Sequence, residues 1–244
     1  MQTSIVTPSS ATEPVVGVVV IGARGRMGRA LLDAIESDPG CALAGIVDRG
    51  DALPTHGDLV IDFSSDEGVK SALAASERLS APLLVGTTAL SEASMQSLRE
   101  ASRRLPVMVT SNASVGVAVM HRMVDLAMRA LGPSWQVRLS ETHHVRKLDA
   151  PSGTALALAE TLRAAGGTIH RADIRSRREG DVVGHHRIEL VGSGETLVIA
   201  HEAHDRALFA RGALRLGLWL RSAGPGWHTT QEWLQNTLEK ARPA

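Results

Sequence analysis

The chain of 244 residues contains little cysteine, few aromatic residues and no net charge. Its single cysteine, Cys41, excludes an intramolecular disulfide and a cysteine-rich metal site. Tyrosine is absent and aromatic residues make up 2% of the chain, so stacking of nucleic-acid bases is not expected. The formal net charge of +0 provides no general attraction to nucleic acid or to an anionic membrane. We therefore expect neither of these as a partner.

Long apolar runs are missing as well. No stretch approaches the ~18 apolar residues that a membrane-spanning helix needs. Residues 1–14 lack the basic start and apolar core of a signal peptide, and we expect a disordered leader there. A cytoplasmic location is the simplest prediction. The 43% apolar and 21% charged residues are typical of a soluble globular protein with one large or two small domains.

The first half of the chain alternates strand and helix patterns. Val15–Ile21 is a β-branched run of the kind that forms a strand buried on both faces. Further strands are predicted at residues 41–48, 58–64, 81–88 and 106–112, and helical patterns separate most of them. This alternation predicts a parallel sheet with right-handed crossovers. Only residues 49–58 separate the second strand from the third, so we expect an open loop there.

The regular alternation of predicted strands and helices ends after residue 112. The patterns predict a helix over 113–132, a strand over 135–144, a helix over 155–165 and a hairpin over 185–204 that turns at 192–194. This order describes a smaller α+β unit. The pattern over residues 212–244 predicts a helical tail, which we expect to pack back onto the first unit.

A glycine-rich turn follows the first strand. Gly22, Gly25 and Gly28 form a G-x-x-G-x-x-G pattern between that strand and a helix, where backbone N–H groups can bind a pyrophosphate. A turn of this kind also occurs without any ligand. Asp48 ends the second strand, where an acid can bind the ribose 2′-hydroxyl of a dinucleotide, and the adjacent Arg49 could bind a 2′-phosphate instead.

Polar residues end two more strands of the predicted parallel sheet. Gly86-Thr87-Thr88 ends the fourth strand and Ser111-Asn112 ends the fifth. Ligands bind beyond the carboxyl ends of strands in such sheets, but Thr and Asn are also ordinary helix caps. Both interpretations stay open on the sequence alone.

The segment "ETHHVRKLDAPSGTALALAE" at 141–160 carries the strongest chemical signal. His143 and Lys147 are groups that can deliver a proton near neutral pH. Ser152-Gly153-Thr154 precedes a good helix, whose first N–H groups can bind an anion such as a carboxylate. The alternatives are a solvated basic loop and a plain serine or threonine N-cap.

A metal site is not expected. The chain has 10 histidines, including the pairs His143–His144 and His185–His186, but adjacent residues on a strand point to opposite faces. "HEAH" at 201–204 has its histidines three residues apart, whereas zinc-protease helices place them four apart.

Four segments together carry a resemblance to a known family: "IGARGRMGRALL", "VGTT", "ETHHVRKLDAPSGTALA" and the stretch from "HRADIRSRREGDVVGHHRIEL" to "GALRLGLWL". From about Val16 to Leu220 the chain resembles the 4-hydroxy-tetrahydrodipicolinate reductase (dihydrodipicolinate reductase) family of bacterial lysine biosynthesis. The resemblance implies reduction of 4-hydroxy-tetrahydrodipicolinate, a small dicarboxylate, to tetrahydrodipicolinate with NADH or NADPH.

The resemblance also implies an architecture. We expect an α/β fold with a Rossmann-type dinucleotide-binding domain over residues 1–112, completed by 213–244. Residues 113–212 are expected to form an α+β substrate-binding and oligomerisation domain, with a mixed, partly antiparallel sheet through which a homotetramer assembles.

Site residues follow from the matched motifs. His143 and Lys147 match the acid/base pair of the family, and His144, Gly153 and Thr154 match its carboxylate binders, beside which we place Ser152. The matched cofactor positions are Gly22, Ala23, Arg24, Gly25, Arg26, Met27, Asp48, Arg49, Gly86, Thr87, Thr88, Thr110, Ser111, Asn112 and Ala113.

Two departures from the family and two rival functions accompany this prediction. The stretch between Asp48 and Asp62 is shorter than usual in the family, and Ala113 stands where the family often has Phe. The rivals are another Rossmann oxidoreductase of small dicarboxylates, such as an aspartate dehydrogenase-like enzyme, and a non-catalytic nucleotide-sensing homologue. Intact His143 and Lys147 favour an enzyme.

Overall fold

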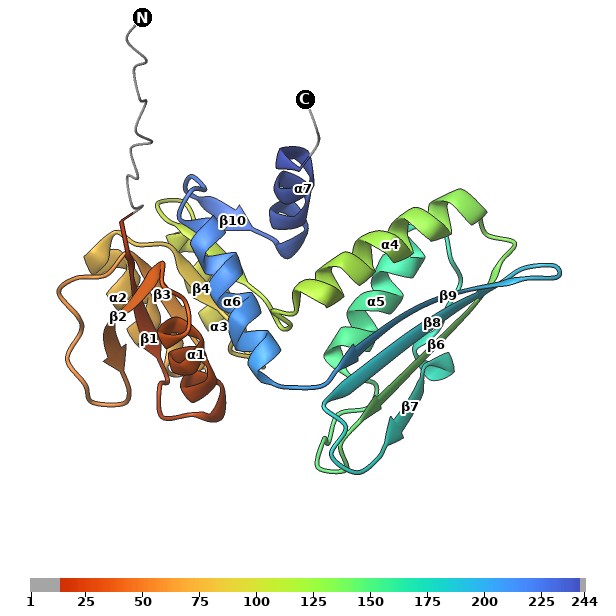
Figure 1. Ribbon diagram of the computed structural model, residues 1–244, viewed down its shortest axis with the longest axis horizontal. Helices are drawn as coiled ribbons and strands as arrows, with labels where there is room; N and C mark the ends of the chain where they lie inside the picture. Colours follow the sequence, from red (N-terminus) through yellow and green to blue (C-terminus); the bar gives the residue numbers. More distant parts are fainter. Residues whose placement is uncertain (1–13, 242–244) are drawn as a thin grey trace, which may run out of the picture.

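The computed structural model describes residues 14–241, so the leader predicted for residues 1–14 lies almost wholly outside the described residues. The chain forms two bodies that lie side by side (Figure 1), one around a six-stranded sheet and the other around a four-stranded sheet. The predicted fold class, a parallel-sheet α/β unit joined to an α+β unit, is confirmed. No helix in the described part of the chain is long and apolar enough to cross a membrane.

The six-stranded sheet is parallel throughout, in the order β10-β5-β4-β3-β1-β2. Its strands are β1 (Val16–Ile21), β2 (Cys41–Val47), β3 (Leu59–Asp62), β4 (Leu83–Val85), β5 (Pro106–Val109) and β10 (Gly226–His228). The chain moves from β1 to β2 on one side and then to β3 on the other side of β1. In sheets of this type a ligand crevice opens at such a reversal, beyond the carboxyl ends of the strands.

Helices cover both faces of this sheet. On one face α1 (Arg26–Glu36) and α6 (Ala207–Leu220) pack against alternate strand residues, and on the other face α2 (Val69–Leu79) and α3 (Glu92–Ala101) pack against the rest. Burial from both sides explains why β3 and β4 are buried at every position and why their sequences are apolar except for Asp62 at the end of β3.

The four-stranded sheet has the order β7-β6-β8-β9. Its strands are β6 (Gln136–His143), β7 (Arg175–Arg178), β8 (Gly184–Val191) and β9 (Thr196–Ala203). Only the β6–β7 pair is parallel, so the predicted mixed sheet and its β8–β9 hairpin are confirmed. Helices α4 (Val115–Leu131) and α5 (Gly153–Ala164) lie on one side of this sheet (Figure 1) and share a core with it.

The predicted helical tail is wrong in one respect. Strand β10 lies between α6 and α7 (Thr230–Lys240) and pairs with β5 at the edge of the parallel sheet. Three residues are too few to show a strand alternation, and only the Gly-Pro-Gly stretch at 224–226 signals the interruption. Helix α6 begins at Ala207 and therefore spans the boundary predicted between residues 212 and 213. The division of the chain into domains at these residues stays a prediction.

Residues 167–184 hold two elements that the patterns did not predict. These are the short 3-10 helix η1 (Arg171–Asp173) and the edge strand β7, whose sequence Arg-Ser-Arg-Arg has no apolar alternation. By contrast, the open loop predicted for residues 49–58 is confirmed, because neither helix nor strand lies between β2 and β3.

Candidate active site

The turn between β1 and α1 forms a cradle of backbone groups. Gly22 has φ +78°, and a Cβ at this position would lie 2.6 Å from the carbonyl oxygen of Phe63. A Cβ on Gly28 would lie 2.2 Å from the carbonyl oxygen of Gly22, so α1 packs directly against the turn. Gly25 is the N-cap of α1 and provides no side-chain cap. The first N–H groups of α1 are therefore available to an anion, as the pyrophosphate of a dinucleotide requires.

Asp48 lies beside this turn, at the end of β2. It lines a cavity of about 510 Å³ together with Gly22, Gly25 and Arg49. Its Oδ2 atom is buried without a hydrogen bond and lies 3.5 Å from Nε of Arg24. A buried acceptor without a hydrogen bond is costly, and a ribose hydroxyl would supply that bond. The residues present thus fit the adenosine half of a nicotinamide dinucleotide.

A charge pair lies at the rim of the same cavity. The guanidinium of Arg49 forms an ion pair with the carboxylate of Glu67, and both side chains are largely exposed. The sequence patterns did not single out Glu67. Its negative charge lies next to the cation that was predicted to attract a 2′-phosphate.

The ends of β3 and β4 are joined by a buried hydrogen-bond network. The Thr87 hydroxyl donates to Oδ2 of Asp62 over 2.6 Å, and the backbone N–H of Ser64 donates to the Thr87 hydroxyl over 2.8 Å. Burial raises the pKa of Asp62. The side chain of Thr87 therefore stabilises the strand ends. A Cβ on Gly86 would lie 2.1 Å from the ring of Phe63, so glycine lets this ring lie against the strand end.

A second cavity, of about 320 Å³, lies between the two bodies. From the parallel-sheet body it is lined by the predicted cofactor residues Met27, Gly86, Thr88, Thr110, Ser111, Asn112 and Ala113. From the other body it is lined by the predicted site residues His143, His144, Lys147 and Thr154. The fold thus brings residues far apart in the sequence into one cavity.

A hydrogen bond connects the two sides of this cavity. Nδ2 of Asn112 donates to the hydroxyl of Thr154 over 2.9 Å, and Oδ1 of Asn112 accepts from the backbone N–H of Ser114 over 2.8 Å. Thr110 holds the same loop through its hydroxyl, which donates to the carbonyl oxygen of Asn112 over 2.8 Å. The end of β5 and the first turn of α5 are therefore held together directly.

His143 ends β6 and is buried. Its Nδ1 atom donates to the buried carboxylate of Glu141, which also accepts from Nη1 of Arg178 at 3.0 and 3.2 Å. Burial lowers the pKa of His143, although Glu141 opposes this shift. Burial alone would raise the pKa of Glu141, but hydrogen bonds from Ser176, His143 and Arg178 lower it below its ordinary value.

Lys147 lies in the loop between β6 and α5. Its Nζ atom is 2.8 Å from Oδ1 of Asp149, and its side chain is 25% exposed. Arg178 donates to two carbonyl oxygens of this loop, those of Lys147 and Asp149. Each of the two predicted proton donors, His143 and Lys147, therefore has a carboxylate partner close in sequence.

Two further histidines line the cavity, each bound to the N-cap serine of a helix. Nε2 of His186 lies 3.2 Å from the hydroxyl of Ser152, which caps α5, and Nε2 of His201 lies 3.3 Å from the hydroxyl of Ser114, which caps α4. Burial lowers the pKa of His186 to about 3 and also lowers the pKa of His201. His186 is therefore neutral at physiological pH.

Six predicted site residues line neither cavity: Ala23, Arg24, Arg26, Thr87, Ser152 and Gly153. Arg24 is exposed and pairs with Asp48, while the Ser152 hydroxyl is engaged by the α5 backbone and His186.

The sequence reasoning missed the roles of Arg178, His186, His201 and Arg206. Arg206, the N-cap residue of α6, is close enough to His144 for its charge to help burial lower the pKa of that histidine. Each of these residues lies at least 30 positions from the 143–147 segment. The sequence around them therefore gives no sign that they belong to the same site.

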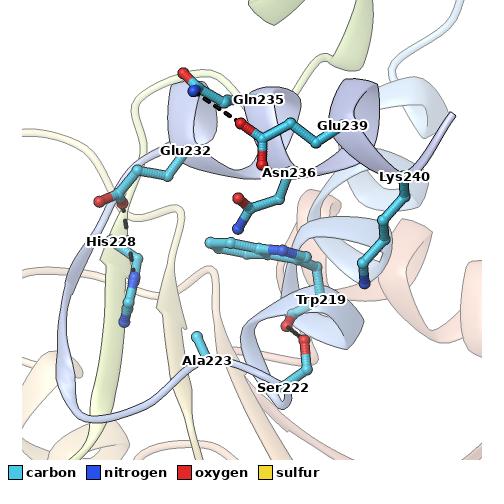
Figure 2. Close-up of a pocket in the computed structure, with 9 residues that line it drawn as sticks. All are labelled: Trp219, Ser222, Ala223, His228, Glu232, Gln235, Asn236, Glu239 and Lys240. Atoms are coloured by element: carbon cyan, nitrogen blue, oxygen red, sulfur yellow. Dashed lines mark hydrogen bonds and ion pairs between the residues drawn. The ribbon is translucent and has the colours of Figure 1, made fainter. Parts of the chain in front are cut away.

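Another cavity, of about 770 Å³, lies between α6, β10 and α7 (Figure 2). The ring of His228 meets that of Trp219 edge to face, with centroids 5.7 Å apart, and its Nδ1 lies 3.6 Å from Glu232. No predicted site residue lines this cavity. We assign the active site to the cavity of about 320 Å³, because only this cavity combines the predicted cofactor residues at the strand ends with His143 and Lys147. Within residues 14–241 no group of three His, Cys, Asp or Glu side chains is placed to hold a metal ion.

Comparisons with known proteins agree along nearly the whole chain. Residues 16–113 match the family model for the N-terminus of dihydrodipicolinate reductase, and residues 116–234 match the model for its C-terminus. A 4-hydroxy-tetrahydrodipicolinate reductase of Xanthomonas campestris pv. campestris is 37% identical over 238 residues, which cover 91% of this chain and 98% of that protein. A reductase of the same name from Thiobacillus denitrificans is 31% identical over 260 residues, covering 89% and 97%.

A solved structure supports the fold. The dipicolinate-bound dihydrodipicolinate reductase from Paenisporosarcina sp. TG-14 superposes with a TM-score of 0.72 at 20% identity, covering 88% of this chain and 97% of that one. The diaminopimelate dehydrogenase of C. glutamicum has a TM-score of 0.56 at 12% identity and covers 93% and 99%.

Proposed function

The chain belongs to the dihydrodipicolinate reductase family, and from this we propose how its residues carry out the reaction. It is an oxidoreductase that uses a nicotinamide cofactor to reduce 4-hydroxy-tetrahydrodipicolinate to tetrahydrodipicolinate, in lysine and diaminopimelate biosynthesis. The observation that carries the residue assignment is the cavity of about 320 Å³, which joins the strand ends of the parallel sheet to His143 and Lys147.

We propose that the cofactor extends along the carboxyl ends of β1 to β5. The pyrophosphate lies on the N-terminus of α1, and the ribose of the adenosine reaches Oδ2 of Asp48, which has no hydrogen bond. The nicotinamide end then lies near Gly86, Thr88 and Asn112, which line the cavity with His143. The bound cofactor supplies the hydride.

The substrate carries two carboxylates, and the opposite wall offers groups that bind them. Lys147 supplies a positive charge, and Thr154 supplies a hydroxyl at the first turn of α5, next to free backbone N–H groups. The ring of His144 lies on the same wall. We propose that these residues orient the substrate ring toward the strand ends. Loss of the 4-hydroxyl group as water gives a conjugated imine, which accepts the hydride at the ring, and a proton then follows from Lys147 or His143.

We propose that both cofactor forms are used, with NADH at least as good as NADPH. Asp48 suits a free ribose 2′-hydroxyl and repels a 2′-phosphate. Arg49 would attract that phosphate, but the ion pair with Glu67 already engages its guanidinium. The short loop over residues 49–58 adds no Lys or Arg beyond Arg49 itself.

We further propose a cytoplasmic homotetramer that assembles through the four-stranded sheet. On the side of this sheet turned toward α4 and α5, Leu139, Ile188 and Ile199 stand in register and are buried. The next row of residues, Ser140, Arg187 and Ala200, faces away from those helices and is more exposed. A sheet face with no helix on it among the described residues is available to a second copy.

A spectrophotometric assay tests this function. NADH or NADPH oxidation is followed at 340 nm with substrate generated enzymatically in the same cuvette. Reduction of NAD⁺ or NADP⁺ is followed at the same wavelength with L-aspartate and meso-diaminopimelate as alternatives, since these compounds can only donate a hydride. We expect turnover with the generated substrate only. Turnover with another compound alone would assign a different reaction, and cofactor binding without turnover on any compound would indicate a nucleotide sensor.

A further inference from the structure

The side chain of Glu141 connects His143 to the interior. Glu141 and His143 are two residues apart on β6, so both point to the same face of the sheet. The carboxylate of Glu141 has no exposed surface, and it accepts a hydrogen bond from Nδ1 of His143. The side chains of Arg178 and Ser176, from the neighbouring strand β7, complete its surroundings. The carboxylate is therefore held from two strands.

Arg178 links this carboxylate to the loop that carries Lys147. It stands opposite His143 in the β6–β7 register. Its Nη1 atom reaches both oxygens of Glu141, its Nε atom donates to the carbonyl oxygen of Lys147 over 3.2 Å, and its Nη2 atom donates to the carbonyl oxygen of Asp149. One side chain thus holds the partner of His143 and the backbone of Lys147 at the same time.

These contacts determine which nitrogen of His143 carries the proton. An ionised carboxylate can only accept, so the hydrogen between Glu141 and His143 belongs to Nδ1. The other ring nitrogen, Nε2, has no hydrogen-bond partner among the described residues. A Cβ on Gly184, which lines the cavity, would lie 3.2 Å from this atom. Glycine at this position keeps the space beside Nε2 open.

We propose that Glu141 and Arg178 are positioning residues of this active site, which hold the proton of His143 on Nδ1 and leave Nε2 as an acceptor facing the cavity. The proposal rests on the function proposed above. It also assigns different roles to the two candidate proton donors, His143 and Lys147. In the neutral ring Nε2 offers a lone pair, so Lys147, with its charged ammonium group, is the residue that delivers the proton.

The variant Glu141→Gln tests the proposal in the full-length protein. Nη1 of Arg178 lies closer to Oε1 of Glu141 (3.0 Å) than to Oε2 (3.2 Å), and Oε2 is the atom that faces Nδ1 of His143. We therefore expect Gln to place its carbonyl oxygen at the Oε1 position and its NH₂ group at the Oε2 position, facing Nδ1. The ring must then accept at Nδ1 and carry its proton on Nε2. We expect kcat to fall by ~10²-fold or more, as when a catalytic histidine is held in the wrong tautomer, with KM for NADH unchanged.

The tautomer is measured without turnover. Two-bond ¹H–¹⁵N spectra of the histidine-labelled protein distinguish the Nδ1–H from the Nε2–H ring, and the signals of His143 are identified by their loss in His143→Gln. We expect the Nδ1–H form in the wild type and the Nε2–H form in E141Q. An Nε2–H ring in the wild type, or an unchanged ring in E141Q, would overturn the proposal.

A matched pair of arginines provides the control. Arg178→Gln removes the link to the Lys147 loop and should lower kcat and raise KM for the dicarboxylate substrate. Arg177→Gln changes the neighbouring residue of β7, which is 72% exposed and pairs with Glu179, and should keep both constants. Equal effects of the two substitutions would mean that β7 contributes only general stability.

The outcomes separate this proposal from the proposed function. If the wild type gives no turnover while the tautomer switches in E141Q, the function is wrong and the positioning role holds. If the wild type turns over and E141Q keeps wild-type kcat, the positioning role is wrong. Should E141Q not fold, Glu141→Asp replaces it. Its carboxylate ends one carbon short of Nδ1, so kcat should fall by ~10-fold, and wild-type kcat would contradict the proposal.

Discussion

Replacing His186 by Gln is expected to make the folded state less sensitive to acid. His186 is 3% exposed, and burial lowers its pKa to about 3. His143, His201 and His185 disfavour its charge further, whereas Glu141 favours it. Gln has an amide at the position of Nε2 and can keep the hydrogen bond to the α5 cap. The substitution therefore removes the titrating group with little loss of contact.

The sign and size of the effect follow from the two pKa values. The folded pKa of about 3 lies below the ordinary value of 6.5, so the unfolded chain binds more protons between these two pH values. The contribution of His186 to the free energy of unfolding is present above pH 6.5 and is lost as the pH falls below this value. From pH 7.5 to pH 5.5 this histidine alone accounts for a loss on the order of 1 kcal/mol in the free energy of unfolding.

Urea denaturation at both pH values, at equal protein concentration, measures this loss. We expect the wild type to lose more stability than H186Q between pH 7.5 and pH 5.5, by on the order of 1 kcal/mol. His56→Gln serves as the control, because His56 is exposed and makes no side-chain hydrogen bond among residues 14–241. This variant should lose as much as the wild type. A loss in H186Q equal to that of the wild type would show that His186 does not titrate as a buried neutral group.

Three further predictions concern the proposed reaction. Lys147→Ala should lower turnover by ~10²-fold or more and leave NADH binding unchanged, because the lysine lies in the other body, and near-wild-type turnover would refute its role. Pyridine-2,6-dicarboxylate should compete with substrate better than the 2-monocarboxylate in inhibition kinetics, and equal inhibition would exclude recognition of paired carboxylates. Asp48→Ser should raise and Arg49→Ala should lower the NADPH/NADH ratio of kcat/KM at fixed ionic strength. A shift of less than a few-fold in both variants, under roughly 1 kcal/mol, would mean that this strand end does not bind the ribose.

Much of the fold could be predicted from local patterns. The β-branched run at Val15–Ile21 and the glycine turn after it predict a strand covered on both faces and an anion cradle, because both features depend on neighbours in sequence. The segment from His143 to Thr154 brings the candidate acid/base pair and a helix N-terminus together within twelve residues. Even Glu141 could have been assigned to His143, since alternate residues of a strand share a face.

The tertiary structure alone decided what completes the site. Arg178 lies 37 residues from Glu141, on an edge strand without apolar alternation, and the β6–β7 register alone brings the two together. The sequence analysis considered His186 only as half of an adjacent pair unsuited to a metal, and the structure shows that β8 places it against Ser152 and His143. Local patterns reflect which face a residue takes on its own element. Which elements meet depends on packing over long sequence distances, and so the cavity between the two bodies could not be seen in the sequence.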